Sequence, residues 1–209
     1  TQSTRNSQWR VFVDNSSNDV FKNTLYGREL NAESYNVSFF EQSTEKSNYS
    51  KPRVALTFDA LDNADGLTPI LDSLSRYGIK STFFINGEFV RRFPTGIKEV
   101  LKAGHQCGSM FFSPYSLQDD SFKFTENFIR RGLARNEDDF YEATGSELSL
   151  VWHMPNYYLT NTILKAGENS GYTWIDKGIQ TNDFITYEKS LKDEVQYMST
   201  SEIIDYVIE

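Results

Sequence analysis

The sequence is short of basic residues and cysteine, and each shortage excludes a class of function. Lys and Arg total 21 against 29 Asp and Glu, so the 209-residue chain carries a formal net charge of −8. This balance argues against nucleic-acid partners, which require a basic surface, and equally against an anionic membrane surface. The single cysteine, Cys107, excludes a disulfide framework within the chain, and its apolar context predicts a buried, unreactive thiol. No run approaches about 18 apolar residues, so no membrane-spanning helix is predicted.

Aromatic residues, in contrast, are abundant. They make up 15% of a chain that is 38% hydrophobic, and they include 16 Phe and 12 Tyr. This composition is typical of a globular protein. It favours either extensive aromatic packing or a groove lined by rings.

Strand-like and helix-like segments alternate along most of the chain. Strands are predicted at 53–60, 81–85, 105–111, 148–152 and 172–175, with helices at 68–77, 88–92, 95–103, 120–145 and 160–169. Gly78 is expected to end the first of these helices, and Glu137 to lie on the outer face of the helix at 120–145. The sequence from Ser199 to Glu202 resembles a capping box that opens a final helix at 203–208. The alternation predicts βαβ units and a parallel sheet, hence an α/β fold that curls into a (β/α) barrel. We expect residues 1–50 to form a small β-rich appendage and 51–209 the barrel. Because the predicted order ends on a helix, we expect this barrel to lack its last strand.

The stretch Arg53–Ala60 is apolar and β-branched and ends on a carboxylate, that of Asp59. We expect a strand buried on both faces, with Asp59 at its C-terminal end. Ligands of α/β folds bind at that edge of the sheet. The alternative is that Asp59 only caps the turn that follows.

Three segments in order resemble the NodB-homology polysaccharide deacetylases, carbohydrate esterase family four. Thr57–Ala60 (Thr-Phe-Asp-Ala) is similar to the family's Thr-Phe-Asp-Asp, 77–85 to its second strand, and 103–108 to the approach to its His-Ser/Thr-x-x-His motif. The resemblance covers about residues 52–208. It implies a distorted (β/α) barrel and a divalent metal used to deacetylate N-acetylglucosamine polymers or acetylated xylan.

The same resemblance implies that the metal ligands are lost. The family's catalytic base corresponds to Asp59, whereas its ligand Asp corresponds to Ala60 and its two ligand His to Met110 and Pro114. Alanine and proline side chains cannot coordinate a metal, and a thioether is a poor ligand for a hard divalent ion. We therefore expect no metal cofactor, and zinc only if the site is rebuilt from other residues.

The family's Arg-x-Pro-Tyr motif corresponds to His153-Met-Pro155-Asn-Tyr157, in which the proline is kept and the ring is shifted by one position. His153 is expected at a strand end opposite Asp59, where it could orient Asp59, act as a general acid, bind a ligand or simply bond within a loop. His105, the other histidine, is expected in the core. The catalytic candidates are thus Asp59 and His153. The candidates for sugar stacking are the residues around them: Phe112, Tyr115, Trp152, Pro155, Tyr157 and Trp174. These rings could equally be core packing.

Two other catalytic arrangements remain open from the residues. A rebuilt metal site would combine Asp59 and His153 with a third carboxylate from among Asp62, Asp65 and Asp176. A serine nucleophile would be Ser109 or Ser113, although neither lies in the Gly-x-Ser-x-Gly context of a nucleophile elbow.

Three functions are compatible with these observations. The first, which we favour, is a ligand-deficient deacetylase homologue that binds a polysaccharide or peptidoglycan-type glycan with little or no hydrolysis. The second is an active carbohydrate esterase, and the third is a structural or protein-interaction domain. The resemblance implies a periplasmic or secreted location.

Overall fold

The computed structural model describes residues 54–114, 124–179, 181, 183, 185, 187–193 and 196–208. The expected appendage at 1–50 and the site candidate Tyr115 lie outside these residues. The chain divides into two units, one ending at Ile175 and the other beginning at Asp176. None of the helices in the described ranges combines the length and the apolar composition that crossing a bilayer requires.

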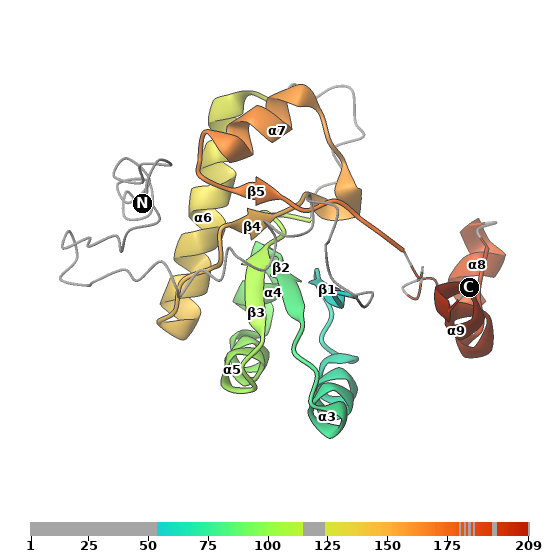
Figure 1. Ribbon diagram of the computed structural model, residues 1–209. Helices are drawn as coiled ribbons and strands as arrows, with labels where there is room; N and C mark the ends of the chain where they lie inside the picture. The colour runs from blue at the N-terminus through green and yellow to red at the C-terminus, as the bar shows by residue number, and fades with distance from the viewer. Residues whose placement is uncertain are drawn as a thin grey trace, which may run out of the picture. The chain divides into compact units, whose positions relative to one another are not determined.

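The first unit is built on a parallel five-stranded sheet whose strand order follows the chain (Figure 1). Its strands are β1 (Thr57–Ala60), β2 (Thr82–Ile85), β3 (Gln106–Ser109), β4 (Val151–Trp152) and β5 (Thr173–Trp174). Each strand pairs in parallel with the next. The predicted α/β fold with a parallel sheet is therefore confirmed, and the sequential order is that of a (β/α) barrel wall.

Helices join successive strands. They are α3 (Leu67–Tyr77), α4 (Gly87–Arg92), α5 (Pro94–Lys102), α6 (Glu126–Thr144) and α7 (Asn161–Glu168), with a 3-10 turn, η2 (Pro155–Tyr157), after β4. Gly78 ends α3 as predicted, because its φ of 64° is a left-handed conformation that glycine adopts without strain. Helix α6 begins at Glu126, after its N-cap Thr125, and not at the predicted cap near residue 120. It packs against both α4 and α7 (Figure 1).

Burial corrects two expectations. Strand β1 is not buried on both faces: Thr57 and Asp59 are exposed, and Val54 just before it is 84% exposed. The reason is that β1 lies at the edge of the described sheet, whereas the inner strand β2 is buried throughout. Glu137 was expected on the outer face of α6 but is buried, where its Oε1 accepts a hydrogen bond of 2.6 Å from the Tyr172 hydroxyl.

The second unit contains α8 (Tyr187–Asp193) and α9 (Thr200–Ile208). The sequence Ser199-Thr-Ser-Glu202 forms the predicted capping box: Glu202 accepts from the Ser199 backbone N–H at 2.7 Å, and Ser199 accepts from the Glu202 N–H at 3.4 Å. Helix α8 was not predicted.

Cys107 is buried in β3, and burial raises the pKa of its thiol to about 12 from 9.0, as expected for an unreactive cysteine. We expect a thiol reagent at pH 8 to label the native protein at least about 1000-fold more slowly than the unfolded protein. The reason is that raising the pKa from 9.0 to about 12 lowers the fraction of reactive thiolate by about that factor. Labelling followed with and without denaturant measures the ratio. Equal rates in both conditions would contradict the burial of this strand.

Candidate functional site

Asp59 and His153 meet at the C-terminal ends of the strands. Asp59 lies in edge strand β1 and His153 directly follows β4, and His153 Nε2 is 3.2 Å from Asp59 Oδ1. The His153 side chain is fully buried, whereas the Asp59 side chain is 38% exposed. The structure thus brings together the two predicted catalytic candidates, which are separated by 94 positions in the sequence.

Three neighbours fix the imidazole of His153. Its Nδ1 lies 2.9 Å from the carbonyl oxygen of Met154. Tyr157 stacks on the ring with centroids 4.1 Å apart and an interplanar angle of 10°, and Phe84 contacts it edge-on at 4.4 Å. Tyr157 reaches this position through a left-handed backbone, with φ of 53°, and the preceding Asn156 has φ of 56°. Such conformations are costly in non-glycine residues and are often associated with functional sites.

The positions that correspond to the family's metal ligands hold no suitable donors. Ala60 and Met110 lie on either side of Ile85, since Ala60 pairs with it in the sheet and the Met110 N–H donates to its carbonyl at 2.9 Å. Met110 is buried in an apolar cluster with Phe84 and Val151, and Pro114 is exposed.

A zinc-type site needs about three protein ligands. In the part of the chain that the structure describes, no three His, Cys, Asp or Glu side chains come close enough to share an ion. The described residues therefore do not fit the metal that the family resemblance implies. Of the carboxylates considered for a rebuilt site, Asp65 accepts a hydrogen bond from the Asn63 side chain at 3.1 Å.

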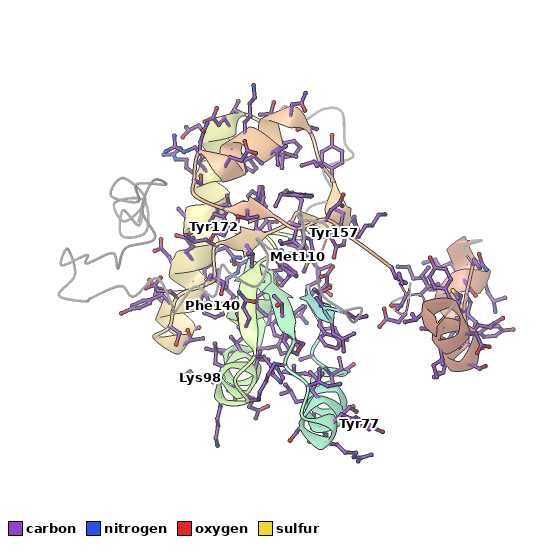
Figure 2. The ribbon with its side chains drawn as sticks, in the orientation of Figure 1. Tyr77, Lys98, Met110, Phe140, Tyr157 and Tyr172 are labelled. Carbon is purple, nitrogen blue, oxygen red and sulfur yellow. The ribbon has the colours of Figure 1, made fainter. Side chains whose placement is uncertain are left out.

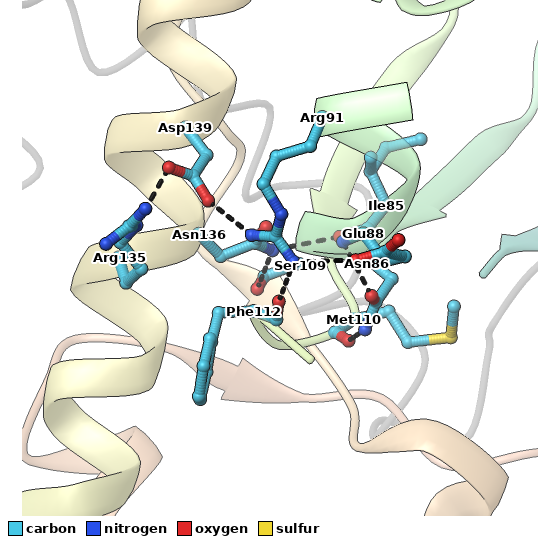
Figure 3. A network of polar contacts seen from close by, with 10 residues as sticks. All are labelled: Ile85, Asn86, Glu88, Arg91, Ser109, Met110, Phe112, Arg135, Asn136 and Asp139. Atoms are coloured by element: carbon cyan, nitrogen blue, oxygen red, sulfur yellow. Dashed lines mark hydrogen bonds and ion pairs between the residues drawn. The ribbon is translucent and has the colours of Figure 1, made fainter. Parts of the chain in front are cut away.

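The loop after β3, which carries Met110, is held by a buried polar network (Figure 3). Asn136 of α6 donates from its one amide nitrogen to the Ile85 carbonyl at 2.9 Å and to the Ser109 hydroxyl at 2.8 Å. Ser109 also accepts from the Phe111 N–H at 3.2 Å. Because these two donors occupy the Ser109 oxygen in the buried interior, the structure does not support Ser109 as a nucleophile.

A second part of the network runs from the buried Asn86 to the exposed Arg91 (Figure 3). Asn86 donates to the Met110 carbonyl at 2.8 Å, and Arg91 donates to the Phe112 carbonyl at 3.2 Å and to Asp139 at 2.7 Å. Sequence reasoning missed both parts. Asn136 gave a signal, however, because it interrupts the apolar face of α6 three residues after Leu133, and a polar residue there predicts a buried hydrogen bond.

The predicted stacking residues divide between core and partly exposed positions. Trp152 is fully buried in a cluster with Ile163 and Tyr172, and Pro155 is buried as well, so the structure places these two in the core and not on a binding surface. The remaining described candidates are half-buried: Phe112, Tyr157 and Trp174. Met110 and Tyr157 lie at the same end of the sheet, whereas Tyr77 and Lys98 lie at the other (Figure 2).

His105 is a core residue, as predicted. It is buried beside Phe83, and its Nδ1 accepts from the Ser81 N–H at 3.3 Å. Burial, and to a smaller extent the Lys80 cation, lower the pKa of His105. His105 is therefore neutral at pH 7 and belongs to the packing, apart from the Asp59–His153 pair.

Comparison with known proteins gives matches over most of the first unit. The family model described as Polysaccharide deacetylase matches residues 46–175. The peptidoglycan-N-acetylmuramic acid deacetylase PdaA of Bacillus subtilis is 30% identical over 149 residues, which are 70% of this chain and 52% of that protein. A peptidoglycan-N-acetylglucosamine deacetylase of Bacillus cereus is 33% identical over 90 residues, 43% of this chain and 31% of that protein.

Solved structures show the same fold at lower identity. A CE4 family pseudoenzyme of Bacillus anthracis, BA3943, superposes with a TM-score of 0.62 at 18% identity and covers 76% of this chain and 51% of that one. A family 4 carbohydrate esterase of Streptomyces lividans superposes with a TM-score of 0.58 at 19% identity, over 74% of this chain and 71% of that one. The chain spans about half the length of the Bacillus subtilis relative and of the pseudoenzyme.

Proposed function

The chain belongs to the polysaccharide deacetylase family, and from that premise we propose that it is a metal-ligand-deficient member that binds a glycan with little or no hydrolysis. The observation that carries this proposal is the chemistry of Ala60, Met110 and Pro114. Two of these side chains have no lone pair to offer, and the third is packed among apolar groups. Without a metal to acidify water, the deacetylation that the family performs loses its nucleophile.

The groups that remain at the strand ends suit binding. Asp59 is partly exposed, and its Oδ2 has no hydrogen-bond partner among the described residues, so it can accept from a sugar hydroxyl or an acetamido N–H. Phe112, Tyr157 and Trp174 are partly exposed residues, and aromatic side chains suit the C–H-lined faces of sugars. The names of the relatives suggest a peptidoglycan-type glycan. Peptidoglycan lies outside the cytoplasmic membrane, which supports an extracytoplasmic location. We keep residues 1–50 as an appendage and 51–209 as the deacetylase-like domain.

Two measurements on the purified protein test this function. Metal analysis after purification without chelator is expected to find zinc, cobalt and nickel far below one per chain, and acetate release from N-acetylated chitooligosaccharide is expected to be absent. Calorimetry with the same oligosaccharide is expected to show binding. Near-stoichiometric metal, with acetate release that a chelator abolishes, would instead establish an active esterase. Absence of both binding and hydrolysis would favour the structural or interaction domain.

Tyr157→Ala is expected to weaken chitooligosaccharide binding about 5-fold, since losing a stacked ring costs on the order of 1 kcal/mol. Tyr77→Ala is the matched control, because Tyr77 is 73% exposed and lies at the other end of the sheet (Figure 2). Calorimetric titration of both variants measures the effect. If the two variants bind equally well, the glycan does not contact the Tyr157 end of the sheet.

A further inference from the structure

Strand β1 has one edge that no other strand covers among the described residues. It lies at the end of the sheet, where it pairs in parallel with β2 on its other side. The carbonyl oxygens of Leu56 and Ala60 face β2, because they accept hydrogen bonds of 3.1 and 3.0 Å from that side. Backbone groups alternate in direction along a strand, so the N–H and C=O groups of Thr57 and Asp59 face away from β2. We call this row of backbone groups the open edge.

The open edge also has an apolar side. Side chains two positions apart lie on one face of a strand, so Leu56 and Phe58 share the face of Ala60, which belongs to the core. Burial on this face decreases toward the start of the strand, from the buried Ala60 to Leu56, which is 41% exposed, and Val54, which is 84% exposed. Asp59, on the opposite face, is exposed. An unpaired edge with uncovered apolar side chains is a template for a further strand.

The chain itself supplies a segment with the matching pattern. Residues 1–53 lead directly into β1 and lie outside the described residues. They include Tyr35–Phe40 (Tyr-Asn-Val-Ser-Phe-Phe), in which apolar residues at 35, 37 and 39 alternate with polar residues at 36 and 38. This alternation is typical of a strand with one apolar and one polar face. A second alternating segment, Trp9–Val13, has Phe12 on its otherwise polar face and is farther from β1, so closing the connecting loop costs more.

We propose that residues 35–40 add an antiparallel strand to the open edge of β1. In this direction the segment ends beside the start of β1, and residues 41–53 form the connection. A parallel strand would instead need a crossover that returns along the length of the strand. The polysaccharide deacetylase family model begins only at residue 46, so the added strand lies outside the part of the chain that matches the family.

The alternation of side chains selects the face that each residue of the added strand occupies. Ser38 opposite Thr57 places two hydroxyl side chains together on the exposed face. The remaining pairs follow from that one: Asn36 opposite Asp59, Val37 opposite Phe58 and Phe39 opposite Leu56. The apolar pairs then cover the side chains that β1 leaves exposed. A shift of the register by one residue would turn the apolar side chains to the exposed face.

Amide hydrogen exchange, followed by NMR in the full 209-residue chain, tests the added strand. We expect the N–H groups of Thr57 and Asp59 to exchange at least about 100-fold more slowly than in an unstructured peptide of the same sequence, because a ladder hydrogen bond protects them. The N–H of Asn86, which donates to the Ala60 carbonyl at 3.0 Å, reports whether β1 and β2 stay paired. Exchange of Thr57 and Asp59 at peptide rates, with Asn86 protected, would overturn the proposal.

Two proline variants identify the segment that donates the strand. In the proposed register the Ser38 N–H donates to the Thr57 carbonyl, so Ser38→Pro removes a ladder hydrogen bond. We expect it to speed the exchange of Thr57 and Asp59 at least about 10-fold while Asn86 stays protected. Phe12→Pro, in the other alternating segment, is the matched control and should leave these rates unchanged. Protection that survives Ser38→Pro, or that Phe12→Pro removes, would assign the open edge to another segment and overturn the proposal.

Dilution distinguishes this strand from one donated by a second copy of the chain. Pairing within one chain does not depend on protein concentration, whereas pairing between copies does. We expect Thr57 and Asp59 to keep the same exchange rates when the protein is diluted about 30-fold. Rates that rise on dilution while Asn86 stays protected would make the open edge a dimer interface and overturn the proposal.

Discussion

Restoring the donors at positions 60, 110 and 114 is expected to create a zinc site. The triple variant Ala60→Asp, Met110→His, Pro114→His would supply one carboxylate and two imidazoles, a donor set that zinc accepts while keeping a position open for water. The first two positions are well placed, because Ala60 and Met110 both adjoin Ile85 and the Asn86 side chain fixes the Met110 carbonyl. We expect the triple variant to bind about one zinc per chain, whereas wild type retains almost none.

Two partial variants serve as controls for the donor set. Ala60→Asp alone and the double variant Met110→His, Pro114→His each lack at least one ligand. Loss of even an outer-shell partner weakens a metal site about 10–100-fold, so both partial variants should bind zinc at least about 100-fold more weakly than the triple variant. Zinc titration with a competing chelator measures the differences. Tight zinc binding by wild type would refute the ligand-deficient function outright.

The zinc graft also has a cost for the fold. Met110 belongs to the apolar cluster with Phe84 and Val151, and a histidine there buries a polar ring. An incompletely paired polar group of this kind costs about 1–3 kcal/mol. We therefore expect the melting temperature of the zinc-free triple variant to fall, and zinc to recover part of the loss because it binds only the folded state.

The fold was largely predictable because its signals are local. Strand β2 is a short apolar run, α5 carries Ile97 and Val100 at helical spacing, and Gly78 and Gly145 stop their helices. Each signal depends on a few adjacent residues. The edge position of β1 and the burial of Glu137 depend instead on which segments lie alongside, and a single sequence does not contain that information.

The candidate site was predictable only in part. The opposition of Asp59 and His153 followed from parallel strands that end at the same edge. The stack of Tyr157 on His153 did not, because it depends on two consecutive left-handed residues, Asn156 and Tyr157, that no local pattern indicates. Trp152 was counted among the site candidates because it ends a predicted strand. The sequence does not indicate whether the ring of a tryptophan at that position faces a groove or the core.

The structure makes Trp152 a test of core packing and not of ligand binding. Its ring is fully buried and meets Tyr172 and Trp174 edge-to-face. It also fills the space above Gly167 of α7, where an added Cβ would lie 2.5 Å from the indole. Truncating it to alanine would open a large cavity between β4 and α7, and buried Trp→Ala substitutions cost about 3–5 kcal/mol.

Trp152→Ala is therefore expected to lower the melting temperature by roughly 6–20 °C, at about 2–4 °C per kcal/mol for a chain of this size. Trp152→Phe should cost less, because it keeps most of the ring volume and removes an indole N–H that has no partner among the described residues. Tyr77→Ala, exposed on α3, should change stability by less than about 0.5 kcal/mol. Calorimetric melts of the three variants decide the matter. Removing a ring that supports the core must loosen the contact between β4 and α7 and so lower the melting temperature. A Trp152→Ala protein that melts like wild type but has lost glycan binding would therefore show that the indole belongs to the ligand site.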